Sequence, residues 1–138
     1  MRAAADGRRA TVEVEDIALP AGGRGRVMVR IFRPSEVEGL LPVVLYLRDR
    51  AGADDRVARD LAARAQAAVL LPDEESDRYL ETSYELLRWV AAEGARRRLD
   101  GTRIALVGDG PAAELALLVL ERGGPHVSAV DALSPPAP

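Results

Sequence analysis

Apolar and polar residues alternate near the start of the chain in the way that half-buried β-strands require. Residues 11–18 place apolar side chains at about every second position, and residues 26–33 (RVMVRIFR) repeat the pattern. A glycine-rich stretch at residues 20–25 separates the two runs, and Pro34 follows the second one. These features predict an antiparallel hairpin.

Further along, three short apolar runs at residues 42–47, 67–71 and 103–107 lack this alternation. Continuous apolar runs of this length are typical of strands that are buried on both faces of a sheet. Between them, residues 54–66 and 76–93 carry apolar side chains at helical spacing. Pro72 is expected to end the strand at 67–71, and Gly94 to end the helix at 76–93. Each buried strand is therefore expected to alternate with an amphipathic helix.

The last part of the chain continues the same alternation. Gly108, Asp109 and Gly110 follow the third apolar run, and a helix is predicted for residues 111–122 because proline is well tolerated in the first turn of a helix. A final strand is predicted for residues 126–132.

A hairpin followed by alternating strands and helices predicts an α/β fold: about six strands, parallel after the N-terminal antiparallel hairpin, with helices on both faces of the sheet. Residues 1–138 have the size of a single domain. Residues 1–10 and 133–138 are expected to be flexible ends of it.

The amino-acid composition excludes several kinds of catalytic and metal-binding chemistry. The chain has no cysteine, no lysine and one histidine, which excludes thiolate catalysis, Schiff-base chemistry, a phosphate-loop lysine and multi-histidine metal sites in these residues. We therefore expect no metal and no cofactor. A net charge of −3 argues against nucleic acid as a partner. Neither a secretory signal nor a membrane span is evident, so we expect a cytoplasmic protein without membrane contact.

Three stretches resemble the hormone-sensitive-lipase-like branch of the α/β-hydrolase family, the acetyl esterases (α/β-hydrolase fold-3). Residues 41–47 (LPVVLYL) resemble that family's third strand, and residues 84–90 (YELLRWV) resemble its Leu-Arg-Trp-Val helix. Residues 103–116 (RIALVGDGPAAELA) resemble its nucleophile elbow, RIAVxGDSAGGxLA. The three occur in the family's order, and the likeness covers roughly residues 12–134. It implies a truncated sheet of the α/β-hydrolase type.

The resemblance also implies that the catalytic positions are degenerate. Gly110 stands where the family has its nucleophilic serine. Pro111 stands where the next N–H helps to hold the oxyanion, and proline has no N–H to donate. Loss of one such donor typically removes about 2.7–4 kcal/mol of transition-state stabilisation.

The family's glycine-rich oxyanion loop (HGGG) corresponds here to Arg48, Asp49, Arg50 and Ala51. Asp49 would place a negative charge beside a developing oxyanion, whereas the two guanidinium groups could stabilise one. With Asp109, these residues outline a possible polar cleft. Alternating charge of this kind is also typical of a solvated, self-paired surface, and both interpretations remain open.

The resemblance further implies that the family's acid and histidine belong to a C-terminal third that these residues do not include. His126 does not replace that histidine, because it begins the last predicted strand, about 16 Å from the elbow at 3.3 Å per residue.

We therefore expect a catalytically inactive pseudo-esterase that acts as a binding or assembly module. The predicted helix at residues 111–122 is apolar nearly all round, and the strand at 126–132 would form an edge of the sheet. Both point to a homodimer or a protein partner. The alternatives are a non-hydrolytic enzyme of the cyclase or isomerase type, a small-molecule binder that uses the cleft, and, more weakly, one part of a split esterase.

Overall fold

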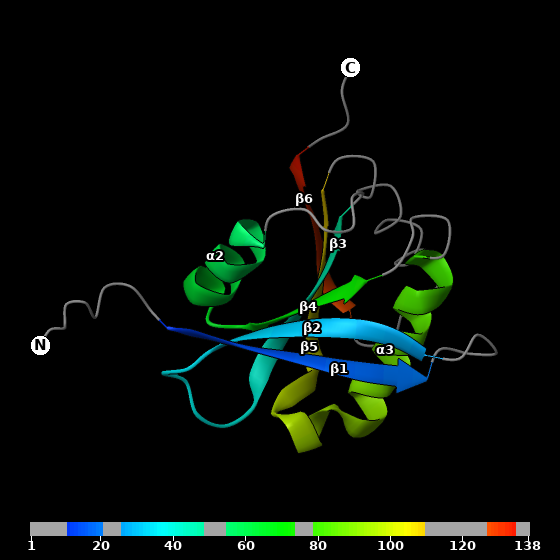
Figure 1. Ribbon diagram of the computed structural model, residues 1–138, viewed down its shortest axis with the longest axis horizontal. Helices are drawn as coiled ribbons and strands as arrows, with labels where there is room; N and C mark the ends of the chain where they lie inside the picture. Colours follow the sequence, from blue (N-terminus) through cyan, green and yellow to red (C-terminus); the bar gives the residue numbers. More distant parts are fainter. Residues whose placement is uncertain (1–10, 21–25, 49–54, 74–78, 110–126, 135–138) are drawn as a thin grey trace, which may run out of the picture.

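The computed structural model describes residues 11–20, 26–48, 55–73, 79–109 and 127–134. Its strands in chain order are β1 (Val12–Pro20), β2 (Arg26–Pro34), β3 (Leu41–Arg48), β4 (Ala68–Asp73), β5 (Leu99–Asp109) and β6 (Val127–Ser134). They form one six-stranded sheet in the order β1-β2-β4-β3-β5-β6 (Figure 1).

The pairing of the strands confirms the predicted hairpin followed by parallel strands. β1 runs antiparallel to β2, and β2 runs antiparallel to β4. β4, β3, β5 and β6 run parallel to one another. The hairpin is therefore joined to the parallel half of the sheet through β4 and lies on the opposite side of it from β6.

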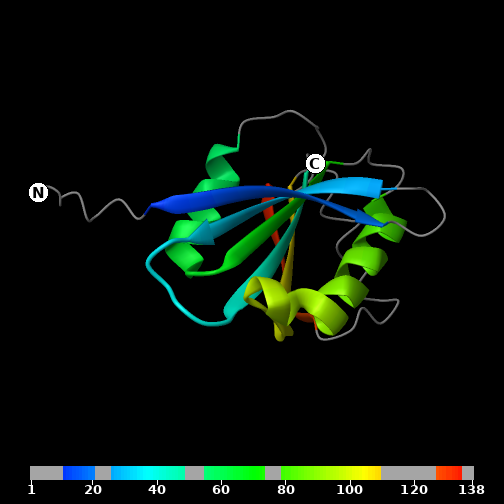
Figure 2. The same ribbon diagram turned by 60° about the horizontal axis from the view of Figure 1, so that its bottom comes forward.

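Both faces of the sheet are covered by helices, as predicted. Helix α2 (Arg56–Ala65) and helix α3 (Tyr79–Glu93) lie on opposite sides of the sheet (Figure 2). The α3 side contains Val43, Leu45 and Leu47 of β3, whereas the α2 side contains the intervening Val44 and Tyr46. All five side chains are buried, because successive residues of a strand point to opposite faces.

The two helices differ in how much apolar surface they bury. α3 buries Leu86, Leu87 and Val90, with Trp89 partly buried beside them. α2 fully buries only Ala58 and Ala62. The α3 side therefore holds the larger share of the apolar contacts between helix and sheet.

Charge pairs fix the hairpin on the α3 side. Glu15 of β1 accepts hydrogen bonds from Arg33 of β2 and from Arg97, both at 2.9 Å. Arg97 belongs to a short 3₁₀ helix (Gly94–Arg97) that follows α3, and its carbonyl accepts a further hydrogen bond from Arg33 at 3.1 Å. The hairpin is thereby tied to the chain segment between α3 and β5.

The ends of some elements differ from the prediction. β4 continues through Pro72, which was expected to end it; Pro72 lies beyond the last pair with β3, where the strand pairs with β2 alone. β5 begins at Leu99 rather than at residue 103. β6 continues to Ser134, so residues 133 and 134, expected in a flexible tail, belong to the sheet. α3 ends at Glu93, as Gly94 predicted.

The predicted helix at residues 111–122 lies outside the described residues. Among the residues that are described, no helix is long and apolar enough to cross a membrane.

A matched pair of leucine variants tests the central position of β3. Leu45 is 1% exposed, whereas Leu40, just before the strand, is 48% exposed. We expect Leu45→Ala to lower the free energy of unfolding by about 2–5 kcal/mol, because the cavity between the sheet and α3 cannot be refilled. Leu40→Ala should change it by less than about 1 kcal/mol. Urea denaturation measures both, and equal effects would contradict the described core.

Candidate functional site

The candidate site lies where β3 and β5 end. Arg48, the last residue of β3, is the register partner of Asp109, the last residue of β5. Asp109 is in turn the register partner of Ser134 of β6. Open α/β sheets bind ligands at the carboxyl ends of their strands, where the direction of the strand order reverses, and β3 occupies such a point because β4 and β5 lie on either side of it.

Arg48 is held by a carboxylate in the structure. Its side chain is 10% exposed, and its Nη2 donates a hydrogen bond of 3.0 Å to Oδ1 of Asp55. Asp55 immediately precedes α2, and its backbone carbonyl accepts the hydrogen bond from Arg59 that opens the helix. At Arg48, therefore, the structure favours the self-paired interpretation of the charged run over a guanidinium that faces a substrate.

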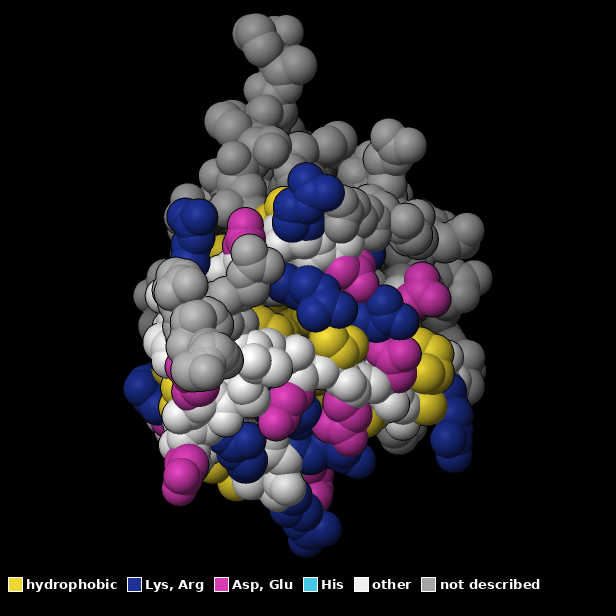
Figure 3. All heavy atoms as spheres, turned by 60° about the vertical axis from the view of Figure 1, so that its left-hand side comes forward, with side chains coloured by type: hydrophobic (Ala, Val, Ile, Leu, Met, Phe, Trp, Pro, Cys, Tyr) yellow, Lys and Arg dark blue, Asp and Glu magenta, His cyan; other side chains and the backbone are white. Residues whose placement is uncertain are grey.

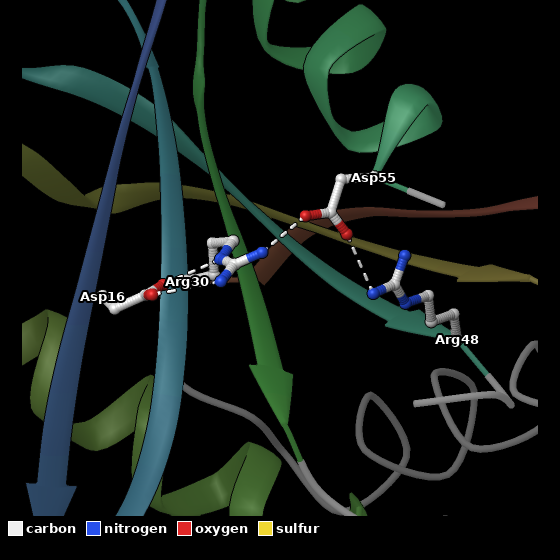
Figure 4. A network of polar contacts seen from close by, with 4 residues as sticks. All are labelled: Asp16, Arg30, Arg48 and Asp55. Carbon is white, nitrogen blue, oxygen red and sulfur yellow. Dashed lines mark hydrogen bonds and ion pairs between the residues drawn. The ribbon is translucent and has the colours of Figure 1, made fainter. Parts of the chain in front are cut away.

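Asp55 is the centre of a longer chain of charges (Figure 4). Its Oδ2 accepts a hydrogen bond of 2.8 Å from Nη1 of Arg30 on β2. Arg30 also donates from Nε and Nη2 to the two carboxylate oxygens of Asp16 on β1, at 2.8 and 3.1 Å. The alternating chain Asp16–Arg30–Asp55–Arg48 thus joins β1, β2, the start of α2 and the end of β3.

The pKa values of these groups follow from their partners. Hydrogen bonds from Arg30 lower the pKa of Asp16. At Asp55, partial burial acts to raise the pKa, but the hydrogen bonds from Arg30 and Arg48 outweigh it, so that the pKa is lowered. Hydrogen bonds to Asp16 and then Asp55 raise the pKa of Arg30. All of these shifts favour the charged forms.

Most of the predicted site lies outside the described residues. Gly110, Pro111, Asp49, Arg50 and His126 belong to that part of the chain. Of the predicted cleft residues, the structure brings Arg48 and the backbone of Asp109 side by side. Arg30 and Asp16 were not among the site residues that the sequence indicated. Among the described residues, no three acidic, cysteine or histidine residues form a group that could hold a metal ion.

The class of fold follows from comparison with solved structures. A thermostable esterase from Pseudomonas putida matches with a TM-score of 0.73 and 26% identity, over 84% of this chain and 41% of its own. An esterase from Pyrobaculum calidifontis matches with a TM-score of 0.73 and 28% identity, over 88% of this chain and 45% of its own. The chain has the α/β-hydrolase fold.

Curated proteins give the narrower relationship. Carboxylesterase NlhH of Mycobacterium tuberculosis is 32% identical over an alignment of 130 positions, and the match covers 83% of this chain and 41% of that protein. The chain is thus a homologue of carboxylesterases of the hormone-sensitive-lipase-like α/β-hydrolase fold, and it spans less than half of their length. No protein-family model matches it.

Acid titration tests the carboxylate contacts. Asp100 has its pKa lowered to about 2 by hydrogen bonds from Thr102 and Arg103, and the pKa values of Asp16 and Asp55 are lowered as well. As the pH falls, the unfolded chain binds protons before the folded chain does, so the free energy of unfolding should decrease from about pH 4 downwards.

The measurement is urea denaturation at several pH values between 7 and 2. Asp100→Asn should weaken the dependence on pH in the acid range, because the variant lacks one of the shifted carboxyls. Asp60→Asn, an exposed aspartate on α2, is the control and should leave the dependence nearly as it is. The assignment is wrong if both variants behave alike.

Proposed function

We propose that the chain is a catalytically inactive relative of the carboxylesterases and acts as a binding or assembly module. The observation that carries the proposal is the sequence after β5. This strand ends at Asp109, and the next two residues, which match the serine elbow of the esterases, are Gly110 and Pro111.

These two residues remove both chemical groups that the elbow supplies. Glycine offers no oxygen to attack a carbonyl carbon, and proline offers no N–H to the oxyanion that would form. An acid and a histidine supplied by another chain would restore neither group. The proposal therefore depends on residues that are present in the chain and not on its length.

The matching oxyanion loop supports the same conclusion. Its first position is Arg48, and this guanidinium is hydrogen-bonded to Asp55. The following Asp49 would bring a second carboxylate toward a negatively charged transition state. A group that stabilises an oxyanion must be free to face it, and a donor already aligned with a carboxylate is poorly placed to do so.

Ester hydrolysis is the direct test of inactivity. We expect no turnover of p-nitrophenyl acetate or butyrate above the rate with buffer. Gly110→Ser alone should not restore it, because Pro111 still lacks the amide hydrogen. A carboxylesterase relative with its own serine serves as the positive control. Activity in the single variant would mean that the remaining machinery is in place, and the proposal would then fail.

For the mode of action, we propose self-association through β6 and residues 111–122. β6 is the terminal strand of the described sheet and pairs with β5. The outer edge of such a strand offers N–H and C=O groups that can pair with a strand of a second chain. Residues 115–120 are apolar in sequence, and burying such side chains between two chains would contribute free energy to association.

Light scattering after size-exclusion chromatography tests this association. We expect the mass of a dimer at micromolar concentrations and above. Amide hydrogen exchange should show that residues 127–134 are better protected at high than at low protein concentration, while the amides of β3 are unchanged. A monomer at every concentration, with equal protection of both strands, would refute self-association.

A ligand-binding role, with or without a reaction of the cyclase or isomerase type, is the second candidate. It is favoured by the opposite charges of Arg48 and Asp109 at adjacent strand ends, the usual ligand position in such sheets. A thermal-shift screen of small polar metabolites distinguishes it from the first: a ligand that stabilises the wild type but not Asp109→Asn would support it.

A further inference from the structure

Helix α2 is attached to the sheet by few apolar contacts. Its fully buried side chains are those of Ala58 and Ala62, each of which contributes a single methyl group. Leu61 is only partly buried, and Val57 in the first turn is 40% exposed. Burial of this extent contributes much less than the two leucines and the valine with which α3 contacts the opposite face.

The sheet under α2 is nevertheless strongly apolar. Phe32, Tyr46 and Val69 are at most 1% exposed in this part of the core, and Val44 and Leu71 accompany them. Among the described elements, α2 is the helix that packs on this face. Helix α2 therefore covers a large apolar surface of the sheet although few of its own apolar side chains are buried.

Polar contacts supply the missing attachment at the start of the helix. Asp55 occupies the N-cap position, yet its side chain makes no capping hydrogen bond to the helix. The carboxylate binds Arg30 and Arg48 instead, on two strands that are separated in the sheet by β4. An N-cap aspartate usually accepts a hydrogen bond from a backbone N–H in the first turn of its helix. Here Asp55 instead connects the start of α2 to the sheet.

The two halves of this attachment differ in their exposure to solvent. The side chains of Arg48 and Asp55 are 10% and 20% exposed, whereas those of Arg30 and Asp16 are 45% and 46% exposed. Salt and water weaken the outer pair most. Removing the carboxylate of the inner pair would take a counterion away from a poorly solvated guanidinium. The inner pair therefore governs the attachment.

The surface around this contact carries many other charged side chains. Side chains of both charges are mixed over the side of the molecule that lies at the left of Figure 1, with hydrophobic side chains in small areas between them (Figure 3). At the ring of Phe32, the guanidinium of Arg59 lies 5.8 Å from the centroid. Arg59 itself is exposed, so the contact lies at the weaker end of the range for cation–π pairs.

We propose that the carboxylate of Asp55 is the latch of a conformational device: while it binds Arg48 and Arg30, α2 covers its face of the sheet. When the latch opens, α2 detaches as a local unit and uncovers the apolar face that contains Phe32 and Tyr46, while α3 and the strands stay folded. Local openings of weakly packed helices below the global unfolding free energy are a general property of folded domains.

The first test uses the wild-type protein alone. Native-state hydrogen exchange at low denaturant should show the amides of α2 exchanging at least about a hundredfold faster than those of β3 and β5, through an opening that exposes little surface elsewhere. If the α2 amides exchange only through global unfolding, together with the strands, the proposal is wrong.

The second test compares two variants that make the same chemical change on the same helix segment. Asp55→Asn removes the latch charge, whereas Asp60→Asn removes an exposed charge one turn further along. We expect Asp55→Asn to speed α2 exchange by about tenfold or more relative to Asp60→Asn, since it removes the carboxylate charge that Arg48 and Arg30 contact. The exchange of β3 amides should differ much less between the two.

Binding of the dye ANS provides the readout for the uncovered face. Fluorescence should rise in Asp55→Asn and stay at the wild-type level in Asp60→Asn, at a temperature where both keep their far-ultraviolet circular dichroism. Equal α2 exchange in the two variants would overturn the proposal. A loss of protection that is uniform over α2 and the strands would overturn it as well, because the contact would then serve global stability only.

Discussion

The structure depends on the burial of β3 on both faces. Its odd-numbered side chains pack with α3 and its even-numbered ones with α2, so a shift of one residue would exchange the two sets of contacts. This constraint fixes the register with β4 and β5, and with it the position of Arg48 beside Asp109 at the end of the strand. The location of the candidate site is thus a consequence of core packing.

What stands at that location differs from the machinery of an esterase. Relatives with this fold are esterases, whereas this chain continues from β5 into Gly110 and Pro111. Each change alone would be costly, since a single oxyanion donor is worth about 2.7–4 kcal/mol. Arg48 meanwhile contacts Asp55 and connects the end of β3 with α2. In our account, charges at this edge of the sheet serve attachment rather than turnover.

The sequence predicted the elements whose physical causes are local. The apolar run at residues 42–47 indicated a central strand, because apolar side chains themselves favour burial. Gly94 indicated the end of α3, because glycine is itself a poor helix former. The continuation of β4 through Pro72 was missed, since it depends on which neighbours the strand has. The pair Asp16–Arg30 follows from the hairpin register, but Arg30–Asp55 requires the order of β2, β4 and β3. That order is a tertiary property.

The central claim is that no residue of this chain acts as a covalent nucleophile at the end of β5. Intact mass spectrometry after incubation with a fluorophosphonate probe tests it most directly, since the probe reports an activated serine whatever the preferred ester. The account predicts an unmodified mass for this protein under conditions in which an esterase of the same fold is fully labelled. A stoichiometric adduct on the folded chain would contradict it.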